Sequence, residues 1–170
     1  MAKVGKAVND KSVFAKQELV HALYGRVESS SIVGIDGWTG VGKTTLGKSI
    51  AEELGGSSYD LDLALTRNLK KYVSNLRMSE VSKALTEAPR PLVISGICLL
   101  KALAMAEIEL DVSIYVKRMA SWGWADEDEL TGLALEIPGA SGELLRREMR
   151  IYHQEWQPHL NADYEFWRMG

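Results

Sequence analysis

The chain has 170 residues, of which 46% are hydrophobic and 25% charged, and its formal net charge is −3. This length and composition fit one well-packed domain and leave little room for a second. The small negative charge gives no overall attraction to nucleic acid or to anionic membranes. We therefore expect a single domain over residues 1–170, with neither of these as a partner.

Residue types that often build sites are scarce. The single cysteine, Cys98, excludes an internal disulfide and lies in an apolar run typical of a core residue. His21, His153 and His159 have no partner at metal-ligand spacing, so a zinc site is not expected. No long apolar stretch follows residues 1–12, which argues against a secretory signal or a membrane span. We expect a cytoplasmic protein, and the sequence does not indicate its oligomeric state.

In chain order, helical and strand patterns alternate. Residues 1–30 form an N-terminal segment with helical spacing within residues 12–27. Strands are predicted at residues 31–35, 58–62, 91–95, 111–116 and 164–168, and further helices at residues 43–54, 69–76, 81–88 and 142–156. Alternating units of this length predict an α/β fold. We expect a three-layer sandwich in which helices cover both faces of a parallel sheet of about five strands.

The strongest motif lies between the strand predicted at residues 31–35 and the helix that follows it. Gly37-x-x-x-x-Gly42-Lys43-Thr44 is a complete phosphate-binding P-loop, which predicts a P-loop NTPase fold. Glycine has no Cβ, so the backbone N–H groups can turn inward around a phosphate, and the helix N-terminus adds partial positive charge. The motif therefore predicts a site for ATP and Mg²⁺. Its predicted nucleotide-binding residues are Gly37, Trp38, Thr39, Gly40, Val41, Gly42, Lys43, Thr44 and Thr45.

Three residues of this loop have individual roles. Lys43 is expected to reach the β- and γ-phosphates, and the Thr44 hydroxyl is expected to bind Mg²⁺. Trp38 is unusual, because P-loops commonly carry a small residue there. Its indole cannot face the phosphates, whose side the amides already fill. It should point out of the loop, either onto a neighbouring helix or into the mouth of an acceptor pocket, and we favour packing.

Paired carboxylates follow in the strand predicted at residues 58–62. Asp60 and Asp62 are two residues apart, and so on one face of a strand, near its carboxyl end. Ligands of open α/β sheets bind at that edge. We predict Asp62 as a catalytic base and metal ligand, and rank Asp60 second because it fits a solvated loop acid better.

Arginines mark the helix predicted at residues 142–156. Arg146 and Arg150 share one face at a spacing of four, and Arg147 and Arg150 share one at a spacing of three. Guanidinium groups can clamp phosphate oxygens bidentately, so we expect at least one of the three to be catalytic. The preceding residues 119–141 are a predicted lid or insert. Its acidic run, residues 126–129, is interpreted as solvated or as part of an acceptor-side surface.

Six stretches carry a resemblance to a known family: "IDGWTGVGKTTL", "YDLD", "LVISGICLL", "DVSIYVKR", "RREMRIYHQEW-P" and "ADYEF". In this order, from about Ser31 onward, they resemble the uridine kinase-like group of P-loop kinases, which includes phosphoribulokinase and bacterial pantothenate kinase. The resemblance implies phosphoryl transfer from ATP to a hydroxyl of a small acceptor, under a mobile lid. It implies a base or metal anchor at Asp62 and lid arginines within residues 146–150.

The sequence departs from this group at Ser95, where a glutamate is usual and where serine cannot supply negative charge near the metal. The acceptor is expected to be a nucleoside or a related sugar or vitamin. Two other functions remain open: a nucleotide-binding regulatory module that has lost catalysis, and an NTP-driven switch or ATPase. The chain lacks an "NKxD" guanine signature, which argues against a GTPase.

Overall fold

The computed structural model describes residues 11–66, 71–131 and 142–170. Its strands are β1 (Ser12–Val13), β2 (Ile32–Gly37), β3 (Ser57–Asp60), β4 (Leu92–Ser95), β5 (Val112–Ala120), β6 (Gly123–Trp124) and β7 (Tyr164–Met169). Its helices are α1 (Lys16–Tyr24), α2 (Lys43–Glu53), α3 (Met78–Glu87), α4 (Leu99–Met105), α5 (Glu127–Thr131), α6 (Glu143–Trp156) and α7 (Pro158–Asn161), with 3₁₀ turns η1 (Leu61–Ala64) and η2 (Val73–Asn75).

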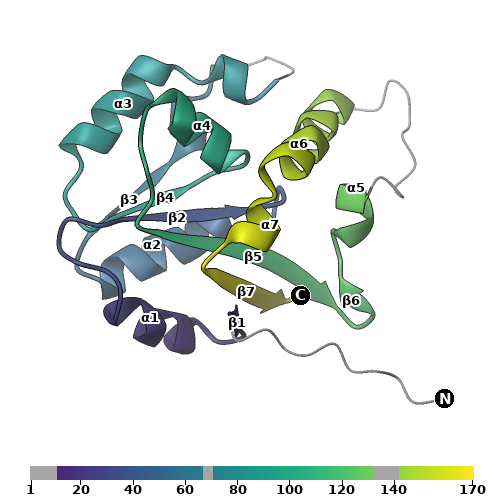
Figure 1. Cartoon of the computed structure of the whole chain (residues 1–170), viewed down its shortest axis with the longest axis horizontal. Coiled ribbons are helices and arrows are strands. Elements are labelled where there is room, and N and C mark those ends of the chain that lie inside the picture. The colour runs from purple at the N-terminus through teal and green to yellow at the C-terminus, as the bar shows by residue number, and fades with distance from the viewer. Residues whose placement is uncertain (1–10, 67–70, 132–141) are drawn as a thin grey trace.

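A central sheet separates two layers of helices (Figure 1). The strands follow the order β1-β7-β5-β2-β4-β3, and all of these neighbours pair in parallel. The short strand β6 pairs with the end of β5 in the antiparallel direction. Helices α1 and α2 lie on one side of the sheet, and α4, α6 and α7 lie on the other (Figure 1). The predicted three-layer α/β sandwich is confirmed.

The middle of the sheet is buried on both faces. Every residue of β2 and of β4 is buried. Parallel strands covered by helices on both sides have no solvent face, so they carry continuous apolar runs in place of an alternating pattern. Gly47 of α2 lies over Ile35 on one face. On the other face, Gly34 leaves room for Leu99 and Leu110, whose side chains would collide with a Cβ there.

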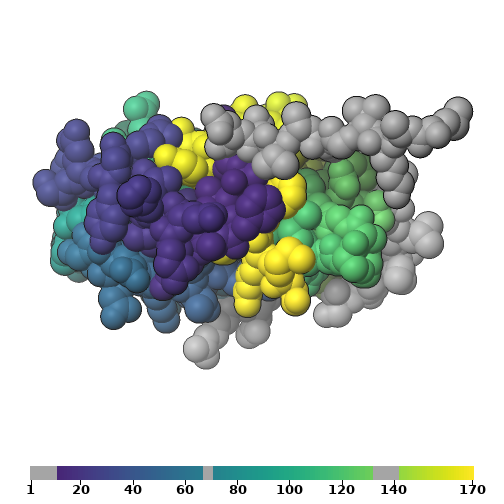
Figure 2. Space-filling view, turned by 90° about the horizontal axis from the view of Figure 1, so that it is seen from below, coloured from purple at the N-terminus to yellow at the C-terminus, as the bar shows by residue number. Residues whose placement is uncertain are grey.

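The sheet has seven strands where about five were predicted. The additional strands β1 and β6 have two residues each. Residues 12 and 13 were included in the stretch with helical spacing, but they pair with Glu165 and Phe166 of β7, and α1 begins at Lys16. Figure 2 shows the two ends of the described chain side by side, with the N-terminal elements in purple against the C-terminal strand in yellow.

The helix predicted at residues 69–76 is wrong where the structure describes it. Residues 67–70 lie outside the described residues, and the segment after them forms only the turn η2. The reason is a distant carboxylate: Glu148 of α6 accepts hydrogen bonds from the backbone N–H groups of Tyr72, at 2.6 Å, and of Val73, at 3.1 Å. Helices α4, α5 and α7 were not predicted. Within the described residues, no helix is long and apolar enough to cross a membrane.

Candidate active site

The loop between β2 and α2 has the backbone that the motif predicts. Gly37, Gly40 and Gly42 have φ angles of 150°, 73° and 91°. Two of these positions also lack space for a side chain. A Cβ on Gly37 would lie 2.7 Å from the carbonyl oxygen of Val116, and one on Gly42 would lie 1.8 Å from a guanidinium nitrogen of Arg168. The same guanidinium donates to the carbonyl of Val41 at 2.9 Å, so β7 helps to hold the loop.

Lys43 folds back over this loop. Its Nζ donates to the carbonyl oxygens of Gly37, at 3.0 Å, and of Trp38, at 2.7 Å. The side chain is buried, and burial lowers the pKa of the ammonium group, while the nearby carboxylates of Asp36, Asp62 and Asp60 act in the opposite direction. Phosphate oxygens can take the place of the two carbonyls, because all are hydrogen-bond acceptors.

Thr44 lies at the start of α2 and meets the end of β3. Its hydroxyl donates to the Asp60 carboxylate at 2.5 Å, and the other oxygen of that carboxylate accepts from the backbone N–H of Asp62 at 3.0 Å. Hydroxyl and carboxylate oxygens are ligands that Mg²⁺ prefers, and Mg²⁺ is commonly held by one or two carboxylates together with substrate phosphates and water. The donor set therefore fits Mg²⁺. The described residues contain no larger cluster of metal-binding side chains.

Asp62 lies beyond the strand on which it was predicted. Strand β3 ends at Asp60, and Asp62 belongs to the turn η1. Its carboxylate accepts a hydrogen bond from the Tyr72 hydroxyl at 2.6 Å. Burial and this carboxylate raise the pKa of Tyr72, which therefore stays a proton donor. Tyr72 was not predicted as a site residue. The turn at residues 71–76 brings its hydroxyl to Asp62, and no local sequence pattern indicates this contact.

These groups line one cavity of about 380 Å³. Its described lining contains the P-loop residues Thr39, Gly40, Gly42, Lys43, Thr44 and Thr45, together with Asp60, Asp62, Leu65, Tyr72, Gly96, Ile97 and Leu145. The structure thus brings the predicted phosphate loop and both predicted carboxylates to the same place. Tyr72 and Leu145 of α6, which were not predicted, also line this cavity.

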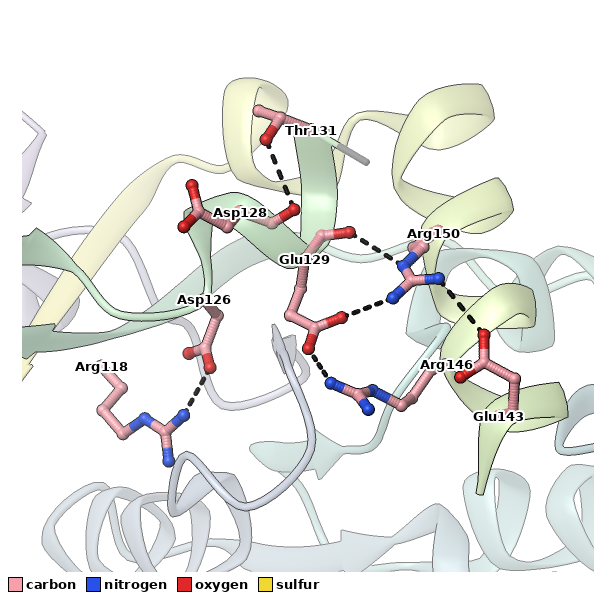
Figure 3. A network of polar contacts seen from close by, with 8 residues as sticks. All are labelled: Arg118, Asp126, Asp128, Glu129, Thr131, Glu143, Arg146 and Arg150. Atoms are coloured by element: carbon pink, nitrogen blue, oxygen red, sulfur yellow. Dashed lines mark hydrogen bonds and ion pairs between the residues drawn. The ribbon is translucent and has the colours of Figure 1, made fainter. Parts of the chain in front are cut away.

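The three predicted arginines are not in the described lining of this cavity. Arg146 and Arg150 both bind the carboxylate of Glu129 in α5, and Arg150 also pairs with Glu143 at 3.4 Å (Figure 3). Arg150 is buried in this network. Arg147 is exposed. In the described structure, Arg146 and Arg150 therefore connect α6 to α5.

The four residues of the acidic run, 126–129, differ in their exposure to solvent. Glu127 and Asp128 are exposed, as a solvated run requires. Asp126 is not, because only 2% of its side chain is exposed, and it pairs with Arg118 at 2.6 Å (Figure 3). Glu129 is only partly exposed and holds two arginines. The solvated interpretation is therefore wrong for these two residues. The rest of the predicted lid, residues 132–141, lies outside the described residues.

Trp38 packs inside the protein. Only 5% of the residue is exposed, and its ring centroid lies 5.8 Å from that of His153 in α6. The indole thus contacts a neighbouring helix, the placement that the sequence favoured. Burial lowers the pKa of His153 to about 4, so Trp38 faces an uncharged imidazole near neutral pH.

Asp36, next to the first glycine of the loop, was missed. It is buried, accepts the N–H of Gly37 at 2.7 Å and accepts the hydroxyl of Tyr152 in α6. Burial raises its pKa to about 6, against the opposing effects of these hydrogen bonds and of Lys43. The only signal in the sequence was an acidic residue at the end of an apolar run. Asp36 joins the first amide of the P-loop to α6.

Comparisons with known proteins point to one fold. The family model of shikimate kinase matches residues 39–84. A candidate uridine kinase from Bacillus stearothermophilus aligns over 89% of this chain and 96% of its own, with 14% identity and a TM-score of 0.58. A candidate fructose transport system kinase from Silicibacter sp. TM1040 aligns over 91% and 100%, with 15% identity and a TM-score of 0.52. A search of curated proteins finds no match. The chain has the fold of the P-loop kinases.

Proposed function

We propose that the protein is an ATP-dependent phosphotransferase that moves the γ-phosphate to a hydroxyl of a small metabolite. One observation carries this proposal: the P-loop and two carboxylates line the same cavity of about 380 Å³. Phosphoryl transfer needs mainly positioning and neutralisation of charge. Bound ATP supplies the phosphoryl group, and bound Mg²⁺ neutralises developing charge on its oxygens.

The loop and Lys43 hold the phosphates in this proposal. The backbone amides of the loop and the N-terminus of α2 face the anion, and Lys43 exchanges the carbonyls of Gly37 and Trp38 for phosphate oxygens. Burial of the ammonium strengthens this contact, because water competes less for it. Thr44 and Asp60 are the residues that would hold Mg²⁺. From the sequence, Asp62 was predicted as the metal ligand, whereas the contact between Thr44 and Asp60 favours its neighbour Asp60.

Asp62 is proposed as the group that receives the proton of the acceptor hydroxyl. Tyr72 holds the carboxylate by donating to one of its oxygens, Oδ1. Oδ2 can then accept a hydrogen bond from an acceptor hydroxyl. Asp62 lies in the same cavity as Lys43, so the acceptor and the phosphates would meet there.

Ser95 leaves no negative charge at the end of β4, and Asp60 stands beside it. The two residues are in register on neighbouring parallel strands. Strands in a sheet lie about 4.8 Å apart, so the Asp60 carboxylate can supply charge close to the position of the missing glutamate. This neighbour supports an active enzyme over a regulatory module that has lost catalysis.

The acceptor is proposed to be a nucleoside or a related sugar or vitamin. The names of the similar proteins refer to uridine, fructose and shikimate. We further propose that at least one of Arg146, Arg147 and Arg150 contacts the transferring phosphate. Arg147 is exposed and forms no ion pair within the described part of the chain, whereas Arg146 must first leave Glu129.

The test is product formation from Mg²⁺-ATP with a panel of nucleosides, sugars and hydroxy acids. We expect a phosphorylated acceptor with one panel member and equal formation of ADP, and none with Lys43→Ala. ADP without phosphorylated acceptor would instead identify an ATPase. ATP binding without any turnover across the panel would identify a regulatory module. Either result would overturn the proposed function.

A further inference from the structure

A second cavity, of about 850 Å³, lies on the face of the sheet that α6 and α7 cover. It is lined by residues of β5, β6 and β7 and of α5, α6 and α7, together with Ser12 of β1. Its described lining shares no residue with that of the cavity at the P-loop. Its volume lies within the range of small-molecule sites, which is roughly 300–1,000 Å³.

Three polar atoms in this lining lack a hydrogen-bond partner. Ser12 Oγ, Trp124 Nε1 and His159 Nδ1 are each buried and unpaired within the described part of the chain. Buried polar groups are nearly always hydrogen-bonded, since leaving one unpaired is costly. Half of the six such side-chain atoms found in the described residues belong to this one cavity. These three atoms are available to pair with a molecule in the cavity that has matching polar atoms.

The charged side chains of the cavity argue against cationic ligands and against phosphates. Lys117 Nζ lies 4.7 Å from the ring centroid of Trp124 and 5.9 Å from that of Trp167, so the chain's own ammonium already fills the cation–π position. It is also paired with Glu165 at 2.8 Å. The remaining carboxylate in the described lining, Glu127, would repel a phosphate. An uncharged ligand fits best.

Four aromatic rings line the cavity, those of Trp124, His153, His159 and Trp167, and a flat ring can stack on such side chains. The ring of His159 lies 5.7 Å from that of Trp124 and 5.8 Å from that of His153. Burial lowers the pKa of both histidines, so these rings are neutral near pH 7. Trp124 Nε1 can only donate a hydrogen bond, whereas the nitrogen of a neutral imidazole can donate or accept according to its tautomer. A ligand must therefore offer at least one acceptor to Trp124.

We propose that this cavity is a second binding site, for an uncharged planar heterocycle with hydrogen-bond acceptors on its ring: a nucleobase or the base of a nucleoside. An acceptor of the ring takes the Trp124 N–H, and further polar atoms pair with His159 and Ser12. The site is independent of the proposed phosphotransfer, because its residues are separate from those at the P-loop. His153 in its lining contacts Trp38 of the P-loop.

The experiment follows the indole N–H resonances of the full chain while adenine or uracil is added. These probes carry no phosphate and no hydroxyl on a sugar, so neither is a substrate for the proposed transfer. A non-hydrolysable ATP analogue with Mg²⁺ is present at saturation, to occupy the P-loop. We expect a saturable shift of the Trp124 resonance, and no shift of Trp122, which is 82% exposed.

A pair of variants tests the same contact. Trp124→Phe keeps an aromatic ring but removes the N–H. It should weaken nucleobase affinity about two- to tenfold, the change expected when one hydrogen bond is lost. Trp122→Phe is the matched control and should bind like the parent. The proposal is overturned if neither probe moves Trp124, if the ATP analogue displaces the probe, or if the two variants bind equally well. Should Trp124→Phe fail to fold, the resonance shift in the parent decides alone.

Discussion

Lys43 is the residue whose contacts connect most directly to ATP binding. Its ammonium spans two carbonyls of the P-loop and is buried beneath them. Lys43→Ala removes the positive charge that would meet the β- and γ-phosphates, so we expect ATP affinity to fall at least about tenfold, the order of a lost charged hydrogen bond. Lys48→Ala, on the exposed side of the same helix, is the control and should bind ATP normally. Calorimetric titration of both folded variants measures the difference.

The two aspartates of the cavity are expected to separate in their effects. Asp62→Asn keeps the shape and the contact with Tyr72 but cannot receive a proton. Phosphoryl transfer should fall by roughly 10²-fold or more, with ATP affinity changed only a few-fold. Asp60→Asn should be milder and should be partly rescued by raising Mg²⁺, because Asp60 contacts Thr44. Steady-state rates over a range of Mg²⁺ concentrations test both. Equal and Mg²⁺-independent losses would contradict these separate roles.

Asp36 gives the folded state a dependence on pH. Its pKa in the folded protein is about 6, above the ordinary value of 3.8, so the folded state binds a proton that the unfolded state releases. The free energy of unfolding contributed by this group is therefore highest below about pH 4 and is lost as the pH rises through 6, by an amount on the order of 2–3 kcal/mol.

Asp36→Asn removes this titration. Relative to the variant, the parent should lose stability between about pH 4 and pH 6 and change no further above pH 7. Urea unfolding of both proteins across this range measures the difference between their free energies of unfolding. A difference that is constant with pH would show that Asp36 titrates as it does in the unfolded chain.

At the scale of elements, ion pairs connect α5 with α6. Glu129 binds Arg146 and Arg150, and Arg150 is buried (Figure 3). Glu129→Gln leaves these guanidinium groups with a neutral acceptor, and should lower the free energy of unfolding by about 1–3 kcal/mol. Asp128→Asn, at the exposed neighbouring position, should change it by less than about 0.5 kcal/mol. Urea denaturation of the two variants provides the measurement.

The elements that were predicted from the sequence are those with local causes. The strand, loop and helix around Gly37–Lys43 follow from an apolar run, three glycines and helical spacing, all within a few residues. The buried strands β4 and β5 were found for the same reason. The P-loop, Asp60 and Asp62 line one cavity, because the carboxyl ends of parallel strands meet at one edge of the sheet.

The elements that were missed depend on distant partners. The segment around Tyr72 was expected to be helical, and its backbone N–H groups instead go to Glu148, on a helix far along the chain. Strand β1 exists only because β7 lies beside it. The contact of Asp36 with Tyr152, and that of Glu129 with Arg150, have the same origin. A single sequence contains no local signal for any of these pairings.

At the scale of the whole molecule, the cavity at the P-loop and the second cavity described above lie on a single sheet. One contains the P-loop and the end of β3, and the other lies over β5 and β7. Trp38 of the P-loop contacts His153, which lines the second cavity. Helix α6 takes part in both, since Leu145 lines the first cavity and His153 the second. A displacement of this helix would therefore change both sites at once.

The order of the strands in the sheet also determines when the fold can be completed. The P-loop strand β2 is made early, but its sheet neighbours are β4, where Ile32 pairs with Leu92, and β5, where Val33 pairs with Val112. The first strand waits longer still, because Ser12 pairs with Glu165. Closing such large loops costs chain entropy before the contacts repay it, which makes folding slow.

During synthesis, the phosphate loop therefore leaves the ribosome attached to a strand that has no partner. We expect a chain that ends at residue 110, before β5, to remain unfolded and sensitive to protease, and the full chain to refold over milliseconds to seconds. Stopped-flow tryptophan fluorescence and limited proteolysis would measure these two properties. A folded, ATP-binding fragment of residues 1–110 would contradict this order. The residues of the phosphate loop are therefore made before the strands that complete the sheet around them.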